Sequence, residues 1–238
     1  AAGYATRLYP LTKDRPKHLL DVQGKPIIEH IISKIQELDD VDEIFVVTNH
    51  KYFHNFVEWA HGFEGKIPMR VYNDGTTSNE DRLGQIGDIK FVLDRAEFDD
   101  DLLIIAGDNL FNFSLRVANT KFRQNRKCLN ALYDVQTAEA ARQLGIATMD
   151  GGSRIVRFEE KPKNPSSTLA SMGIYFFPKE KVQLLHDYIE GGNKPDKMGY
   201  FMEWLLEKDE LLGHIYTEKW FDIGWHESLE QARREFRA

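Results

Sequence analysis

The sequence predicts an α/β fold in which a mostly parallel sheet has helices on both faces and carries an inserted antiparallel lobe. Over residues 1–126, segments with apolar residues at helical spacing alternate with short β-branched runs, and this alternation is typical of a parallel sheet. Beyond residue 126, apolar runs follow one another at short separations around a Gly151-Gly152 turn signal, as antiparallel strands do. We therefore expect a single domain over residues 1–238, with one half at 1–126 and the other at 127–238.

The first half is expected to alternate helices with strands. Pro26 stands at a plausible first helical position and is followed by apolar residues at helical spacing, which predicts a helix over residues 26–38. Further helices are predicted over 52–61 and 84–95. Strands are expected over 44–48, 69–72 and 102–106, because these runs are short and rich in β-branched or apolar residues.

The second half is expected to contain most of the antiparallel strands. These strands are predicted over 128–134, 146–149, 155–159 and 172–177. Helices are expected over 179–190, 200–208 and 226–236, with an extended segment over 215–223 between the last two.

Composition limits the class of protein. Of 238 residues, 42% are hydrophobic and 29% are charged, and the apolar runs are too short to cross a bilayer, so no membrane segment is expected. The single cysteine, Cys128, excludes an intrachain disulfide and favours a cytoplasmic setting; it lies in an apolar run and is expected in the core. A net charge of −7 argues against nucleic acid as a partner.

Positive charge is concentrated in the first 25 residues, which hold five basic and two acidic side chains. The loop from Gly3 to Lys17 combines small residues, a hydroxyl and four cationic side chains before any regular element. Backbone N–H groups of a tight turn bind anions, and Arg and Lys add charge, so this loop is typical of a phosphate-binding site. The alternative is a solvated basic loop that caps the following helix.

The segment GYATRLYPLTKDRPKHLLDVQGKPIIEHI closely resembles the signature of the nucleotidyltransferases that join a nucleoside triphosphate to a sugar 1-phosphate, the glucose-1-phosphate thymidylyltransferase and uridylyltransferase group. The resemblance implies a Rossmann-like sheet with an inserted sugar-binding lobe. It also implies that Gly3, Tyr4, Ala5 and Thr6 bind the nucleotide. The catalytic residues would be Arg7, which contacts the leaving phosphates, and Lys17, which lies by the α-phosphate.

Two features depart from the family pattern. Ala5 stands where the family usually has a second glycine; because a left-handed alanine costs about 1–2 kcal/mol, we expect a turn that alanine can adopt. Phosphate loops of this kind follow a central strand, whereas the given sequence begins in the loop. We therefore expect that about six or seven aliphatic residues, forming that strand, precede Ala1 in the native protein.

Two aspartates are candidate metal ligands. Asp108 follows the predicted strand 102–106, at the sheet edge where ligands bind in open α/β folds, although a turn or helix-cap role is an equal alternative. The resemblance implies that Asp108 also contacts the nucleotide. It further implies that Asp108 and Asp222, the latter in a Trp-x-Asp-x-Gly pattern, hold one Mg²⁺.

The candidate residues for the sugar phosphate, which accepts the nucleotidyl group, lie in the half at 127–238. They are Gly145, the Glu160-Lys161-Pro162 run and Gly173. Taken alone, a Glu-Glu-Lys-Pro run is typical of exposed charge. The resemblance implies that Glu160 binds sugar hydroxyls, that Lys161 neutralises the sugar phosphate, and that Gly145 and Gly173 line this site. With these segments the resemblance spans nearly the whole chain.

Residues 73–88 occupy the place where the family reads the nucleobase. Thr77, Asn79, Gly84 and Gln85 are the candidate nucleotide contacts, but the family's usual Gln-x-x-x-x-Gly-Leu arrangement is absent, with Thr77 and Arg82 at that spacing. The base is therefore left open. Turn chemistry and a helix start are the alternative for this polar stretch.

The resemblance implies Mg²⁺-dependent transfer of a nucleotidyl group to a sugar 1-phosphate, with nucleoside triphosphate and sugar phosphate as partners. One alternative is a CTP:phosphocholine cytidylyltransferase, whose acceptor site should contain an aromatic cage for a quaternary ammonium. Another is a non-catalytic regulatory domain that binds nucleotide sugars. The identity of the sugar and self-association into a homo-oligomer are left open.

Overall fold

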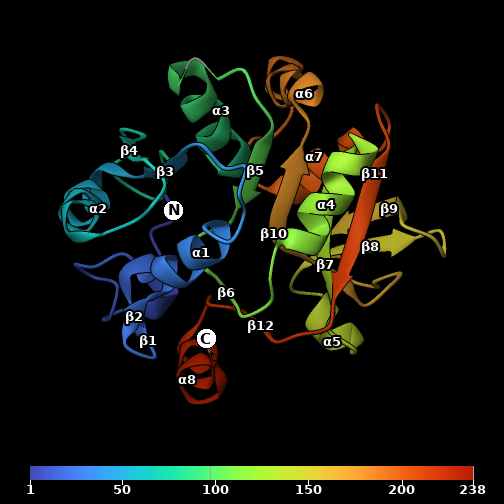
Figure 1. The fold of residues 1–238 in the computed structure, drawn as a ribbon. Helices are drawn as coiled ribbons and strands as arrows, with labels where there is room; N and C mark the ends of the chain where they lie inside the picture. Colours follow the sequence, from blue (N-terminus) through green and yellow to red (C-terminus); the bar gives the residue numbers. More distant parts are fainter. Residues whose placement is uncertain (97, 238) are drawn as a thin grey trace. The chain divides into compact units, whose positions relative to one another are not determined.

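In the computed structural model, which describes residues 1–96 and 98–237, the chain has a mixed α/β fold (Figure 1). It forms two compact units, each assembled from separate stretches of sequence. The first unit contains Ala1–Leu83, Ala106–Arg116 and Glu218–Ala238, and the second contains Gly84–Ile105 and Val117–Thr217. These boundaries differ from the expected division at residue 126, and the expectation of a single domain stays a prediction.

The second unit is built on a six-stranded sheet with the strand order β5-β10-β7-β11-β9-β8. The strands are β5 (Leu102–Ile105), β7 (Cys128–Asp134), β8 (Gly145–Met149), β9 (Arg154–Glu160), β10 (Leu169–Phe177) and β11 (Leu211–Tyr216). β7 and β11 run parallel, and the other neighbouring pairs run antiparallel. β10 additionally pairs with β8.

Helices cover this sheet and complete the core of the second unit. They are α3 (Gln85–Ala96), α4 (Arg116–Asn125), α5 (Ala138–Ala141), α6 (Lys179–Glu190) and α7 (Met198–Leu205). Leu93, Leu185 and Phe201 from three of these helices join one hydrophobic cluster with Cys128. Cys128 is fully buried, and this burial raises the pKa of its thiol to about 12. The expectation that Cys128 is a core residue is confirmed.

The first unit consists of small sheets and helices. β3 (Ile44–Thr48) runs parallel to β4 (Met69–Asn73), β6 (Asn109–Phe111) runs antiparallel to β12 (Trp220–Asp222), and β1 (Asp21–Val22) pairs with β2 (Lys25–Pro26). The helices are α1 (Ile27–Ile35), α2 (His50–Gly62) and α8 (His226–Glu235), with short 3₁₀ turns at Thr6–Leu8 and Lys17–Leu19. The Asn49 side chain caps α2 by accepting the Tyr52 N–H at 3.0 Å.

The predicted elements are present, but the expected mostly parallel sheet is not confirmed. Among the pairings in the described residues, only β3–β4 and β7–β11 are parallel. β5, expected as a parallel strand, lies antiparallel to β10. Apolar patterning identifies a strand but does not select its neighbour, which here comes from about 70 residues further along the chain.

Helices α4 and α5 and strands β1, β2 and β6 are absent from the sequence prediction, and β11 begins at Leu211, four residues before the extended segment expected over 215–223. Helix α4 has few apolar positions, with only Ala118 and Phe122 buried, so its periodicity is weak. Strand β6 has three residues, too few for a period-2 pattern to be recognised.

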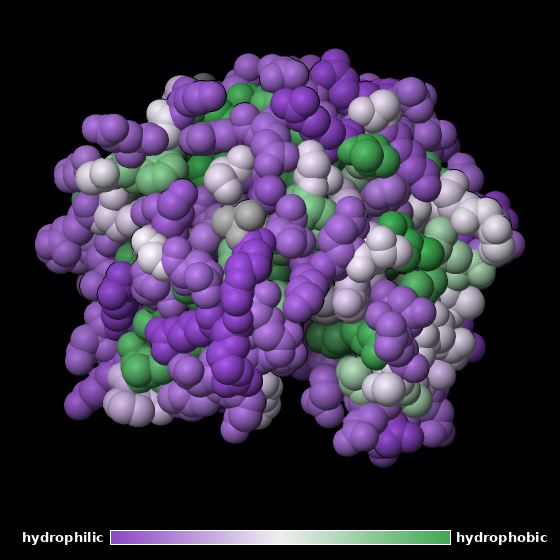
Figure 2. Space-filling model, turned by 60° about the horizontal axis from the view of Figure 1, so that its bottom comes forward, coloured by the Kyte–Doolittle hydropathy of each residue, from purple (hydrophilic) through white to green (hydrophobic). Residues whose placement is uncertain are grey.

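The face in Figure 2 is covered mainly by hydrophilic residues, with hydrophobic ones in separate small patches. The exposed large hydrophobic residues are Tyr9, Leu11, Val117, Val156, Ile215 and Trp225. In the described part of the chain, no helix combines the length and the apolar character that crossing a bilayer requires.

Candidate functional site

The N-terminal loop of the first unit is shaped by buried hydrogen bonds. The Tyr52 hydroxyl lies 2.6 Å from the carbonyl oxygen of Thr12 and 3.1 Å from that of Tyr4. The Thr12 hydroxyl donates to the Ala5 carbonyl at 2.7 Å. Tyr52 and Thr12 are both fully buried, so these contacts hold the loop backbone from its inner side.

Ala5 adopts a left-handed conformation, with φ 48° and ψ 40°. This is the conformation that favours glycine, and an alanine there carries a cost of about 1–2 kcal/mol. The turn at Ala5 is therefore one that glycine would adopt at lower cost, made in this chain with alanine. Gly3 has open space around it, since a Cβ at that position would have no neighbour within 4 Å.

Lys17 and Asp108 form the central ion pair of the first unit. The Lys17 ammonium lies 2.5 Å from Asp108 Oδ2 and also donates to the Ile223 carbonyl at 3.4 Å. Burial alone would raise the pKa of Asp108, but the charge and hydrogen bond of Lys17 outweigh it and hold that pKa well below its usual range. Asp108 therefore stays ionised at neutral pH.

Strands β6 and β12 bring the two predicted metal ligands close together. Asp222 is the cross-strand partner of Asn109, and the Ile223 N–H donates to the Asp108 carbonyl at 3.0 Å. The two aspartates are thus neighbours although they are more than a hundred residues apart in sequence. No group of three or more His, Cys, Asp or Glu suited to a metal is found in residues 1–96 and 98–237. A pair of carboxylates completed by substrate phosphates is a donor set that suits Mg²⁺.

Arg7 projects from the 3₁₀ turn of the loop and stacks on a tryptophan. Its guanidinium carbon lies 4.3 Å from the centroid of the Trp225 ring. Trp225 is 52% exposed and directly precedes helix α8. This contact joins residues more than two hundred positions apart, so local sequence patterns do not predict it.

The predicted base-reading residues divide between the two units. In the first unit, the Asp81 carboxylate accepts hydrogen bonds from the backbone N–H groups of Thr77 at 3.0 Å and Ser78 at 2.9 Å. These bonds lower the pKa of Asp81. The Asn79 carbonyl accepts from Arg82 at 2.9 Å. The segment that carries Thr77 and Asn79 is therefore an organised turn.

In the second unit, Gly84 and Gln85 begin helix α3 against residues 195–198. Gly84 has φ +83°, and a Cβ there would lie 2.6 Å from the backbone of Pro195 and Asp196. Gln85 Oε1 accepts the Met198 N–H at 2.8 Å. Both residues thus have structural roles at the start of α3.

The predicted acceptor residues lie on strands of the second unit. Gly145 of β8 faces Glu160 of β9 across the strand pair, and a Cβ at Gly145 would lie 3.4 Å from Glu160 Oε2. The Glu160 side chain is only 9% exposed, and its Oε1 lies 3.4 Å from the Lys197 ammonium. Gly199, in the first turn of α7, has no room for a Cβ beside the same carboxylate.

The two remaining acceptor candidates have unusual backbone conformations. Lys161 directly follows β9 and has φ 49°, and its N–H donates to the Leu144 carbonyl at 3.1 Å. Its side chain is exposed. Gly173 has φ 69° and lies in an irregularity of the β10–β7 ladder, where Asn130 Nδ2 donates to the Ile174 carbonyl at 3.1 Å. The glycine is required at this bulge.

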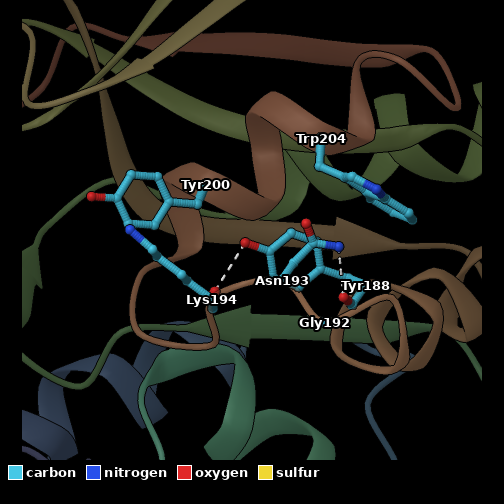
Figure 3. Close-up of a pocket in the computed structure, with 6 residues that line it drawn as sticks. All are labelled: Tyr188, Gly192, Asn193, Lys194, Tyr200 and Trp204. Carbon is cyan, nitrogen blue, oxygen red and sulfur yellow. Dashed lines mark hydrogen bonds between the residues drawn. The ribbon is translucent and has the colours of Figure 1, made fainter.

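A separate hollow of about 340 Å³ lies beside α7 in the second unit (Figure 3). Its lining residues are Tyr188, Gly192, Asn193, Lys194, Tyr200 and Trp204. The Tyr188 hydroxyl donates to the Lys194 carbonyl at 2.9 Å, and the Lys194 ammonium lies 6.0 Å from the Tyr200 ring centroid. None of the predicted site residues lines this hollow.

Lys197 and Trp225 contact two of the predicted site residues, although the sequence analysis assigned a role to neither. Lys197 lies in the loop before α7 and contacts Glu160, which is 37 residues earlier in the sequence. A local sequence pattern does not predict a contact over that distance.

Residues 1–238 match the family model described as nucleotidyl transferase. The bifunctional protein GlmU of Methanocaldococcus jannaschii is 30% identical over 230 residues, covering 94% of this chain and 50% of that protein. UTP–glucose-1-phosphate uridylyltransferase AglF of Haloferax volcanii is 25% identical over 236 residues, covering 98% of this chain and 93% of that protein.

A solved structure with the same fold is that of a Bacillus anthracis protein assigned as a glucose-1-phosphate thymidylyltransferase, in complex with sucrose. It superposes with a TM-score of 0.80 at 26% identity and covers 100% of this chain and 94% of its own. This chain spans 50–58% of the length of several curated relatives that it matches.

Proposed function

Because the chain belongs to the nucleotidyl transferase family, we propose that it transfers a nucleotidyl group from a nucleoside triphosphate to a sugar 1-phosphate, giving an NDP-sugar and pyrophosphate. The observation that carries this proposal is the arrangement of the first unit. Lys17 pairs with Asp108 at 2.5 Å, Asp222 lies on the neighbouring strand, and the basic loop bears a glycine-type turn. Cations and carboxylates are thereby combined in a site suited to a polyphosphate.

In the proposed reaction, an oxygen of the sugar phosphate attacks the α-phosphorus in line. A new P–O bond forms to the sugar phosphate, and the bond between the α-phosphorus and the pyrophosphate oxygen breaks. A phosphate monoester is already ionised near neutral pH, so no protein nucleophile is needed. The protein must hold two anions together and stabilise the charge that develops in the transition state.

Lys17 and Arg7 are proposed to provide that stabilisation. Lys17 would donate to the α-phosphate, and Arg7 would donate to the departing pyrophosphate through its planar fork. Asp108 and Asp222 would hold a divalent cation, for which Mg²⁺ fits because both ligands are hard carboxylate oxygens. When bound, the ion supplies positive charge to the phosphate oxygens. The low pKa of Asp108 keeps this ligand ionised before any cation binds.

On the acceptor side, Glu160 and Lys161 are proposed to bind the sugar hydroxyls and the sugar phosphate. This proposal is supported by the burial of the Glu160 side chain, which is 9% exposed, and by the small residues Gly145 and Gly199 beside its carboxylate. Thr77, Asn79, Gly84 and Gln85 remain candidate nucleotide contacts, and Gly173 remains a candidate acceptor contact through the backbone of its bulge.

The phosphocholine alternative can be weighed against the aromatic hollow of the second unit. Tyr188, Tyr200 and Trp204 present aromatic surfaces there, as a cage for a quaternary ammonium would. However, Tyr200 already has the ammonium groups of Lys194 and Lys197 at 6.0 and 5.5 Å from its centroid. These cations would repel choline, which favours a sugar phosphate as the acceptor.

The proposal is tested by product analysis with the Asp108→Ala variant. Phosphorus NMR of wild-type reactions containing Mg²⁺, glucose 1-phosphate and UTP or TTP should show an NDP-sugar and pyrophosphate. The kcat of Asp108→Ala should be lower than that of the wild type by a factor of about 10²–10³. Val117→Ser is the matched control, because Val117 is 62% exposed and lies outside every proposed site. Full turnover by Asp108→Ala would show that the metal assignment is wrong.

A further inference from the structure

Trp225 is an exposed aromatic residue with a fixed backbone. Its N–H donates to Ser228 Oγ at 3.2 Å, and its carbonyl accepts the Leu229 N–H at 3.1 Å, so the first turn of α8 determines its position. With 52% of its surface exposed, its side chain contributes little to the core. A large apolar ring held in this way needs an explanation other than packing.

The ring of Trp225 supports the guanidinium of Arg7. The distance of 4.3 Å from the guanidinium carbon to the ring centroid lies well within the range of a cation–π contact. Within residues 1–96 and 98–237, no ion pair or side-chain hydrogen bond of Arg7 is found. Such a contact engages the guanidinium without consuming its N–H groups, so the five donors remain available to an anion.

The segments that carry the two side chains are also joined directly. His226 Nε2 donates to the Tyr9 carbonyl at 2.9 Å, which links the start of α8 to the end of the 3₁₀ turn that bears Arg7. This hydrogen bond lies one residue from Trp225 and two residues from Arg7, so it supports the contact between them.

We infer that Trp225 is a positioning residue, which holds the Arg7 guanidinium by its face so that its N–H donors are presented to the terminal phosphates of the nucleotide. This inference rests on the proposed function, since it assigns Arg7 to the leaving pyrophosphate. It explains why an aromatic residue stands at the exposed start of α8. A flexible arginine loses conformational freedom when it binds an anion, and prior stacking lowers that loss.

The test is a double-mutant cycle on the purified protein, with inorganic tripolyphosphate as the calorimetric ligand. Trp225→Ser should raise the Kd for tripolyphosphate about two- to fivefold, the range of an exposed cation–π contact. Trp225→Phe should retain most of the affinity, because it keeps an aromatic face. In the Arg7→Ala background, Trp225→Ser should have no further effect, because the group that it positions is absent. Val117→Ser serves as the exposed-hydrophobic control.

The outcomes separate this inference from the proposed function. An equal loss from Trp225→Ser with and without Arg7, or no binding of tripolyphosphate by the wild type, would overturn the inference. A cycle with the expected coupling in a protein that forms no NDP-sugar would support the positioning role and contradict the proposed reaction. In active protein, Trp225→Ser should raise the KM for the nucleotide while Trp225→Phe restores it.

Discussion

Arg7 in the N-terminal loop of the first unit and Glu160 on strand β9 of the second unit are both predicted site residues, but their surroundings are opposite in kind. Arg7 lies on the aromatic face of Trp225, and among residues 1–96 and 98–237 no side-chain hydrogen bond of its guanidinium is found. On the acceptor strands, the Glu160 carboxylate is only 9% exposed and already meets the Lys197 ammonium. We infer that Arg7 is prepared to receive an anion, whereas Glu160 must exchange Lys197 for substrate hydroxyls. Substitutions in the two regions should therefore affect different kinetic constants.

The largest effect is expected from Lys17→Ala. Removing this donor should lower kcat about 10²–10³-fold, the usual cost of losing one electrostatic contact to a transition state. Steady-state kinetics of NDP-sugar formation would measure it. Lys25→Ala is the matched control, because Lys25 is a neighbouring exposed lysine with no assigned role. A change in the KM for sugar phosphate with kcat retained would contradict the difference between the two regions.

The second prediction concerns the pH dependence of stability in the second unit. Burial raises the pKa of Cys128 to about 12, whereas the thiol of the unfolded chain titrates near 8.5. Between these values the folded state binds more protons, so stability should fall by about 1.4 kcal/mol per pH unit above pH 9. Urea unfolding of the wild type and Cys128→Ala from pH 8 to 11 tests this. Parallel stability curves for the two proteins would show that Cys128 is not the group responsible.

A smaller and kinetically different effect is expected from Glu160→Gln. This substitution keeps the shape of the side chain but removes its charge, so sugar hydroxyls lose a charged acceptor and Lys197 loses its ionic partner. The KM for sugar 1-phosphate should rise about tenfold, with the KM for nucleotide nearly unchanged. Initial rates with each substrate varied in turn measure the two constants. A rise confined to the KM for nucleotide would contradict the assignment of Glu160 to the sugar phosphate.

The smallest effect is expected from Ala5→Gly. Alanine costs about 1–2 kcal/mol in a left-handed conformation, and glycine recovers this but makes the unfolded chain more flexible. The net result should be a gain in stability of about 0.5–1 kcal/mol, measured by urea unfolding. Ala1→Gly, outside the left-handed turn, is the control. Destabilisation by Ala5→Gly would show that the turn does not carry this strain.

The sequence predicted individual elements better than their partners. Strands β3 and β7 and helix α6 have the bounds that the patterning predicts, because the two strands are short runs of mostly apolar residues and the helix repeats its apolar residues at helical spacing. The neighbour of β5 was not predictable, since the pairing with β10 depends on contacts distant in sequence. The same limit applies to the predicted site. The family signature predicts Lys17 and Asp108 as site residues, and the structure pairs them, but their roles stay predictions. The contacts of Arg7 with Trp225 and of Glu160 with Lys197 arise only in the folded chain.

The most direct test of the central claim is pyrophosphate release by the protein with Mg²⁺, glucose 1-phosphate or phosphocholine, and each of TTP, UTP, CTP, ATP and GTP. We predict turnover that requires a sugar phosphate and prefers one base, which would also identify the nucleotide that residues 73–88 accept. Release only with CTP and phosphocholine would contradict the sugar assignment, and triphosphate binding without release in any mixture would indicate a regulatory domain.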